Sequence, residues 1–161
     1  MIDLGWSAPE RRVDAGTARR VILAQHARIR VLLEDAGRLA ESALQGNVPQ
    51  PETIAAAIGD IRTTMEIHLA SEESLLLPLL RADLPVGPLR ADRLLDEHRR
   101  QRATLVSLES EAHAHPELPE LAAKLTFLTD WLLADMAEEE ASLLIDDVVR
   151  DDIVVIDQSS G

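Results

Sequence analysis

The chain has 161 residues, enough for one domain with a sizeable hydrophobic core, and 46% of its residues are hydrophobic. Its formal net charge of −13 would repel phosphate backbones, so a nucleic acid is not an expected partner. The absence of cysteine excludes disulfides, thiolate nucleophiles and thiolate metal ligands. Any metal ion must therefore be held by nitrogen and oxygen.

The same composition favours helices. Alanine and leucine are abundant, aromatic residues make up 2% of the chain, and glycine and proline gather between long periodic segments. No segment approaches the roughly 18 continuous apolar residues that a membrane-spanning helix needs. Together with the absence of cysteine, these features predict an all-α, cytoplasmic protein with no membrane partner.

Three parts are expected along the chain. Residues 1–15 form a polar N-terminal arm, residues 16–149 form a helical domain, and residues 150–161 form a C-terminal tail. Thr17 is the expected N-cap of a first helix that runs to about Gln45, where Gly46 ends it. Steps of four and three residues give this helix an apolar core face that contains one histidine: Ile22, His26, Ile29, Leu33, Ala36, Ala40 and Ala43.

The second helix carries the most informative pattern of the chain. Pro51 opens it in the way proline favours a first helical turn, and we expect it to end near Pro78 to Leu80. His68 and Glu72 lie one turn apart and therefore point the same way. They interrupt an otherwise apolar core face, which consists of Ile54, Ile58, Ile61, Met65, His68, Glu72, Leu75 and Leu79.

The third and fourth helices repeat this design. After a turn rich in proline and glycine, the third helix runs to about Ala112, with the core face Leu94, His98, Gln101, Leu105, Leu108 and Ala112. The fourth helix begins near Glu117 to Glu120 and places two acids, Asp135 and Glu139, among the apolar residues of its core face. That face consists of Leu121, Leu125, Leu128, Leu132, Asp135, Glu139, Ser142 and Asp146. We expect Gln101 to hydrogen-bond near the site. We expect Glu73, Glu138 and Glu140 to form a solvated acidic face.

The two halves of the chain resemble each other. A shift of 72 residues places His26 on His98, and a shift of 67 residues places His68 and Glu72 on Asp135 and Glu139. Two helical hairpins of similar design bury four apolar faces most simply as an antiparallel, up-down-up-down four-helix bundle. Each hairpin then supplies one histidine from its first helix and an i,i+4 pair from its second.

Six residues would face the axis of this bundle: His26, His68, Glu72, His98, Asp135 and Glu139. Three unpaired carboxylates buried there would each cost several kcal/mol, so either they are protonated, water enters the core, or cations bind. Two divalent ions would leave one excess positive charge, which a bridging hydroxide would cancel. Mixed imidazole and carboxylate ligands suit iron, manganese or zinc better than calcium or magnesium.

This arrangement resembles the hemerythrin-like family. The cation-binding HHE domains of that family use a histidine on the first helix, HxxxE on the second, a histidine on the third and HxxxE on the fourth. The matching residues, over about residues 17–149, are His26, His68 with Glu72, His98 and Glu139. The resemblance implies a hemerythrin-like bundle with a non-haem site of two iron ions, bridged by an oxo or hydroxo group. Such a site binds dioxygen, or serves iron and oxygen sensing or peroxide or nitric oxide chemistry.

Two positions depart from the family pattern. Asp135 stands where the fourth helix of the family carries histidine, and Arg102 stands four residues after His98, where oxygen-carrying members have another histidine. The negative charge of Asp135 would favour ferric iron. Reversible carriage of dioxygen is therefore not the function we expect.

Three functions remain as hypotheses. The first is a di-iron protein that handles or senses dioxygen, peroxide or nitric oxide. The second is an iron-buffering or ferroxidase-like protein, and the third is a helical interaction module with a structural or degenerate metal site. The sequence shows no helix-turn-helix, kinase or transmembrane segment, so we expect a sensing role to need a separate protein partner.

Overall fold

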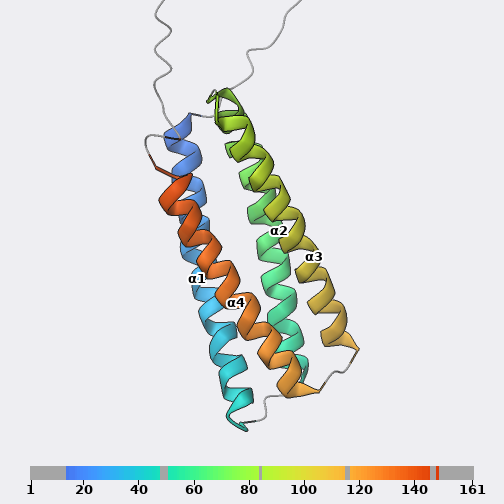
Figure 1. The fold of residues 1–161 in the computed structure, drawn as a ribbon. Coiled ribbons are helices and arrows are strands. Elements are labelled where there is room, and N and C mark those ends of the chain that lie inside the picture. The colour runs from blue at the N-terminus through green and yellow to red at the C-terminus, as the bar shows by residue number, and fades with distance from the viewer. Residues whose placement is uncertain (1–13, 48–50, 84, 115–116, 146–147, 149–161) are drawn as a thin grey trace, which may run out of the picture.

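The computed structural model describes residues 14–47, 51–83, 85–114, 117–145 and 148. Within these ranges the chain forms four helices and no strands: α1 (Ala15–Leu44), α2 (Pro51–Ala82), α3 (Gly87–His113) and α4 (Leu118–Ser142). The helices run alternately up and down and form an antiparallel bundle, with α1 beside α4 and α2 beside α3 (Figure 1). The predicted all-α, four-helix fold is confirmed. The predicted tail, most of the predicted arm and the predicted core-face position Asp146 lie outside the described residues.

Two predicted helix ends are wrong. The N-cap of α1 is Asp14, whose carboxylate accepts a hydrogen bond from the Thr17 backbone N–H, so the helix begins before Thr17. Helix α2 continues through Pro78 to Ala82. Proline weakens a helix interior by about 3 kcal/mol. The last turn holds because Leu76, Leu77 and Leu80 on either side of Pro78 are buried in the core.

Glycine shapes two of the turns. Gly46 adopts a φ of 87°, and hydrogen bonds from its N–H and from that of Asn47 close the end of α1. Gly87 begins α3 so close to α2 that a Cβ atom would lie 1.7 Å from the Leu80 carbonyl oxygen. Only glycine permits this approach, which brings α3 back along α2.

The core faces of α1 and α3 match the prediction. The core face of α2 shifts by one residue after Glu72, and that of α4 departs from the prediction at Asp135 and at Ser142. On α2, Leu76 and Leu80 are buried in place of Leu75 and Leu79. On α4, Asp135 is half-buried and Met136 is buried, and Ser142 is exposed. The cause is helix geometry, because a helix with 3.6 residues per turn drifts by about 20° per heptad against a strict 3.5-residue repeat.

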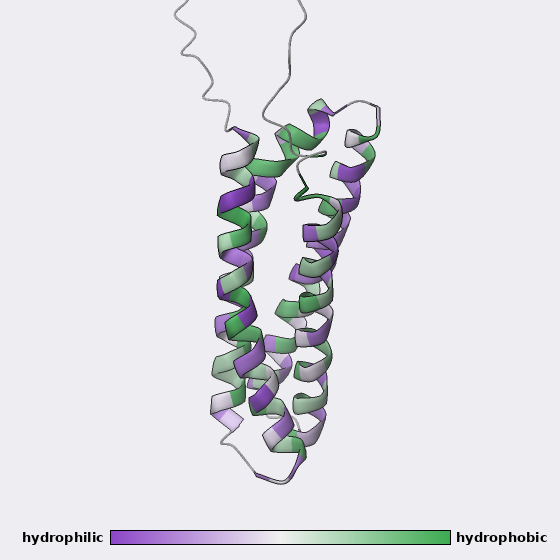
Figure 2. Ribbon diagram, turned by 90° about the vertical axis from the view of Figure 1, so that its left-hand side faces the viewer, coloured by the Kyte–Doolittle hydropathy of each residue, from purple (hydrophilic) through white to green (hydrophobic). Residues whose placement is uncertain are grey.

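The buried residues form two apolar clusters with polar residues between them. One cluster includes Ile29, Met65, Leu105 and Leu132, and the other lies toward the opposite end of the bundle and includes Ile22, Leu76 and Leu94. Between them on the four helices lies a polar layer, defined as His26, His68, Glu72, His98 and Glu139, all buried. Hydrophobic and hydrophilic residues alternate along each helix (Figure 2). The two apolar clusters thus hold the polar layer from both sides.

None of the described helices is both long and apolar enough to cross a membrane.

Candidate metal centre

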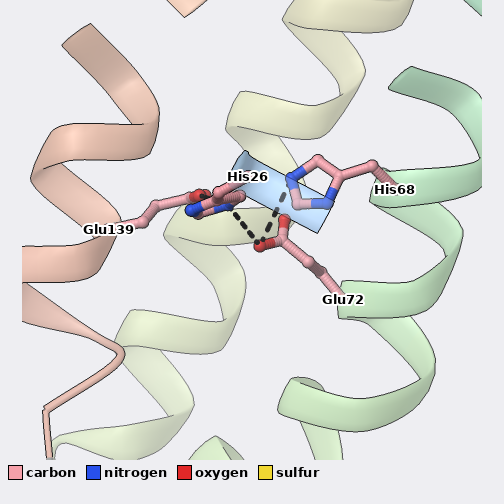
Figure 3. A group of neighbouring side chains, drawn as sticks. All are labelled: His26, His68, Glu72 and Glu139. Carbon is pink, nitrogen blue, oxygen red and sulfur yellow. Dashed lines mark ion pairs between the residues drawn. The ribbon is translucent and has the colours of Figure 1, made fainter. Parts of the chain in front are cut away.

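Four side chains of the polar layer converge from three helices. His26 comes from α1, His68 and Glu72 from α2, and Glu139 from α4, and they point toward one another between the helices (Figure 3). Each offers one nitrogen or oxygen atom, and these atoms all lie within 4.8 Å of one another. Two imidazoles and two carboxylates this close together could hold a metal ion through nitrogen and oxygen.

Glu72 connects this cluster to the third imidazole. Its Oε1 atom lies 3.7 Å from His26 Nε2 and 3.6 Å from His68 Nε2, while its Oε2 atom lies 3.1 Å from His98 Nε2. The two oxygens of one carboxylate thus face different imidazoles. A carboxylate in this orientation can serve two ions at once, with one oxygen for each.

The three imidazoles are held in the same way. Each turns its Nε2 atom toward Glu72 and directs Nδ1 to an outer acceptor, which orients the ring. The three outer contacts are His26 Nδ1 to Glu140 Oε1 at 2.9 Å, His98 Nδ1 to Glu73 Oε1 at 3.0 Å, and His68 Nδ1 to Gln25 Oε1 at 3.0 Å. With Nδ1–H as the donor in each pair, each Nε2 atom can bind a metal ion once it carries no proton.

Glu73 and Glu140 are therefore not a solvated acidic face, and that prediction is wrong. We call these two residues the outer carboxylates. Glu140 also accepts from Arg30 at 2.8 Å, and Glu73 accepts from Arg102 at 2.7 Å. Each arginine lies one turn after the histidine that shares its carboxylate. The repeated Glu-Glu pairs, together with an arginine four residues after each histidine, are the sequence signal that could have revealed this support.

Glu138 does lie on the surface, where it pairs with Arg93.

Asp135 stands apart from the other five candidate residues. It is half-buried, and its Oδ2 atom accepts a hydrogen bond from Gln101 Nε2. Gln101 is fully buried, in line with the expectation that it bonds near the site, and its partner is Asp135 on the neighbouring helix α4. The structure thus brings His26, His68, Glu72, His98 and Glu139 together and leaves Asp135 at the edge.

The imidazoles titrate very differently. Burial lowers the pKa of His26, but the neighbouring carboxylates of Glu139, Glu72 and Glu140 outweigh it and raise this pKa to about 10. Burial lowers the pKa of His68 to about 4, and the positive charges of His26 and His98 add to this effect while the carboxylate of Glu72 opposes it. At neutral pH, His26 is therefore an imidazolium and His68 is a neutral imidazole.

The carboxylates also differ. Burial raises the pKa of Asp135 to about 6, with the charge of Glu97 adding to the effect. Burial likewise raises the pKa of Glu139, whereas for Glu72 the contacts with His26 and His98 overcome burial and lower the pKa. In the metal-free protein, the imidazolium of His26 supplies positive charge beside the buried anions, and a proton on Glu139, whose pKa is raised, removes one negative charge.

Two atoms at the centre of the layer have no hydrogen-bond partner. They are His26 Nε2 and Glu72 Oε1, both fully buried. Buried polar atoms in folded proteins are nearly always paired, so unpaired atoms that face each other call for a ligand. A cation bound by nitrogen and oxygen would satisfy both. The residues present therefore fit a metal ion of the type that imidazole and carboxylate ligands prefer.

The comparisons with known proteins give one match. The model of the hemerythrin HHE cation-binding domain matches residues 17–144, which span all four helices and all six candidate residues. No curated protein and no solved structure matches the chain significantly.

Proposed function

The chain belongs to the hemerythrin HHE cation-binding family, and from this premise we propose that it is an iron protein that handles or senses dioxygen, peroxide or nitric oxide. We propose that two iron ions are held by His26, His68, Glu72, His98, Asp135 and Glu139. Manganese and zinc are the alternative metals for this ligand set. When bound, iron would supply the reversible electron transfer that this chemistry requires.

One observation carries the proposal. The buried carboxylate of Glu72 divides its two oxygens between different imidazoles, and each imidazole is oriented from outside so that Nε2 faces the centre. A structural histidine in an apolar core would need partners for its two nitrogens, but nothing would require three such histidines to face one carboxylate. Three histidines oriented alike around one carboxylate instead match the outer hydrogen bonding that metal-bound histidines show.

The protein's own groups would set the reactivity. Three carboxylates offset much of the charge of two divalent ions and favour the ferric state. Burial raises the pKa of Glu73 and Glu140, but the hydrogen bonds from the histidine and the arginine beside each acid outweigh it and lower both pKa values, so the outer carboxylates stay ionised. Ionised outer carboxylates make the imidazoles stronger electron donors. These features support oxidation and sensing chemistry over reversible dioxygen carriage.

The decisive experiment is elemental analysis of protein purified without added metal, together with optical spectra before and after reduction. We expect two iron ions per chain and a change in visible absorption when the reduced protein meets dioxygen or nitric oxide. Protein that contains only zinc, or whose spectrum ignores both gases, would contradict the proposal.

A second candidate function is iron buffering or ferroxidase activity. The half-buried Asp135 favours it, since a carboxylate near solvent can exchange an ion more easily than a buried imidazole can. Repeated oxidation of added ferrous ion, well beyond two ions per chain, would identify this function. Oxidation that stops after the first two ions would favour the first candidate.

A further inference from the structure

The seam between α3 and α4 is the loosest in the bundle, because α3 packs mainly against α2 and α4 mainly against α1. A pocket of about 220 Å³ lies in this seam, and its lining includes Asp135 and Glu139. A water molecule takes up roughly 30 Å³ in the liquid, and organic ligands usually need at least about 300 Å³. The pocket therefore has room for an ion with some of its water but is small for an organic molecule.

The pocket opens toward solvent between charges that compensate each other. Arg93 of α3 pairs with Glu138 of α4 at 3.1 Å, and the two side chains are 78% and 63% exposed. Two further arginines of the lining are paired as well: Arg100 with Glu97 on its own helix, and Arg90 with Asp83 at 3.3 Å. The outer part of the pocket thus carries acids and arginines in pairs, which gives it little net charge.

The inner end of the pocket differs from the outer part in the partners of its carboxylates. Asp135 contacts the amide of Gln101, and Glu139 contacts the imidazole of His26, rather than a lysine or an arginine. Glu139 is only 7% exposed, yet it lines the pocket, so the pocket reaches the polar layer itself. The carboxylates at this end offer oxygen ligands to a cation that arrives from solvent.

Unpaired buried atoms lie just beyond these carboxylates. His26 Nε2, which has no hydrogen-bond partner, lies 3.4 Å from Glu139 Oε2. Gln101 Oε1 is also buried and unpaired on the side chain that holds Asp135. A cation that reaches the end of the pocket would thus meet further ligand atoms directly behind it.

We propose that the pocket between α3 and α4 is the port through which divalent cations enter the centre, with Asp135 and Glu139 as their first protein ligands. The inference rests on the proposed function, because a port has a purpose only if the polar layer binds metal. To the proposed metal centre, the inference adds the route by which the cation enters and the order in which it contacts the side chains. The cation meets the two carboxylates first and the imidazole of His26 behind them.

The first test blocks the port. Ser142 lines the pocket, is exposed and lies outside the polar layer, so Ser142→Trp should fold and fill the entrance. Ser107→Trp is the matched control, because Ser107 is also exposed and lines a different pocket in the same seam. Uptake of Co²⁺ by metal-free protein is followed by visible absorption in a stopped-flow instrument. We expect Ser142→Trp to slow uptake about tenfold, because an indole ring is large relative to the pocket, with unchanged final stoichiometry and a normal rate for Ser107→Trp.

The second test changes the charge of the entrance. Arg93→Glu would make the entrance acidic and should accelerate Co²⁺ uptake by about two- to tenfold at low salt, an effect that added salt should remove. Arg38→Glu is the control, because Arg38 is a similarly exposed arginine paired with one acid, and it does not line the pocket. That variant has the same net charge change and should leave the rate near that of the wild type.

The outcomes separate the two proposals. If wild-type protein binds no Co²⁺ at equilibrium, the proposed metal centre is wrong and the port falls with it. If Co²⁺ binds with normal stoichiometry but Ser142→Trp and Arg93→Glu behave like their controls, the centre stands and the port is overturned. Slower uptake in Ser142→Trp and faster uptake in Arg93→Glu, with controls unchanged, would establish the port.

Discussion

The polar layer has two similar halves, in each of which a histidine is held by an outer carboxylate and an arginine. The halves differ in one inner residue. His26 with Glu140 and Arg30 is repeated by His98 with Glu73 and Arg102, in line with the internal duplication. The inner partner is not repeated. His68 is held by Gln25 in one half, which we call the closed half, and Asp135 is held by Gln101 in the other, which we call the open half.

The difference shows how one substitution divides a duplicated site into two kinds of position. In the closed half, the imidazole of His68 is buried and belongs to the four-residue cluster. In the open half, the shorter side chain of Asp135 stays at the edge, is half-buried and lines the pocket to solvent. We expect the closed half to bind an ion tightly and the open half to bind one that exchanges.

The largest effect should come from Glu72, because both halves use it. In Glu72→Gln, the amide keeps the size of the side chain but loses the negative charge that faces all three imidazoles. We expect metal affinity to fall by more than about 100-fold in both halves. Titration with Co²⁺, followed by calorimetry, measures the loss.

Glu52→Gln is the matched control for this change, since Glu52 lies on the same helix and is exposed. Circular dichroism should show that both variants keep the helical bundle. Normal metal binding by folded Glu72→Gln would show that this carboxylate is no ligand. The two halves would then not share a ligand.

The next prediction separates the halves directly. His68→Ala should weaken binding of the tight ion by more than about 100-fold, whereas Asp135→Ala should weaken only the exchangeable ion, by about tenfold. The reason is that His68 belongs to the four-residue cluster and Asp135 does not. Stepwise Co²⁺ titrations of the two variants report each ion separately. Equal losses in both steps for both variants would mean that the halves are equivalent.

The outer carboxylates offer the opposite test, because here the halves should agree. Glu140→Gln and Glu73→Gln each weaken the hydrogen bond that orients one imidazole, and each removes one negative charge beside an arginine. Losses of outer partners usually cost 10- to 100-fold in metal affinity. We expect losses of about this size in each variant, measured by the same titration. A loss in only one of them would show that the duplicated supports are not equivalent.

Much of this arrangement could be predicted from the sequence, because the repeat of apolar residues and the spacing of the polar residues determine which side chains share one face of a helix. His26 and His98 are buried as predicted, since each replaces an apolar residue in a regular core face. Spacing alone could not place Asp135, because a small angular drift along α4 moves it to the edge and buries Met136. The roles of Glu73 and Glu140 depend on contacts between helices, which no spacing within a single helix specifies.

The smallest expected difference between the halves is in how their metal affinities depend on pH. The pKa of His26 is raised to about 10, so an ion that binds Nε2 must displace a proton, and its affinity should fall about tenfold per pH unit as the pH decreases below this value. Asp135, with a pKa of about 6, takes up a proton only in more acidic solution, so binding in the open half should weaken further below about pH 6.

The stability of metal-free protein should show the opposite trend and decrease as the pH rises. The pKa of His26 is raised above its ordinary value of 6.5, so its charge stabilises the fold fully below about pH 6.5, and this contribution is lost as the pH rises toward 10. We therefore expect the urea midpoint of metal-free protein to fall between about pH 7 and pH 10, while bound Co²⁺ prevents that fall because it replaces the proton. Chelator-competition titrations and urea unfolding across this range measure both trends. A Co²⁺ affinity that does not change with pH would mean that His26 is neutral before metal binds, and that protons do not distinguish the closed half from the open half.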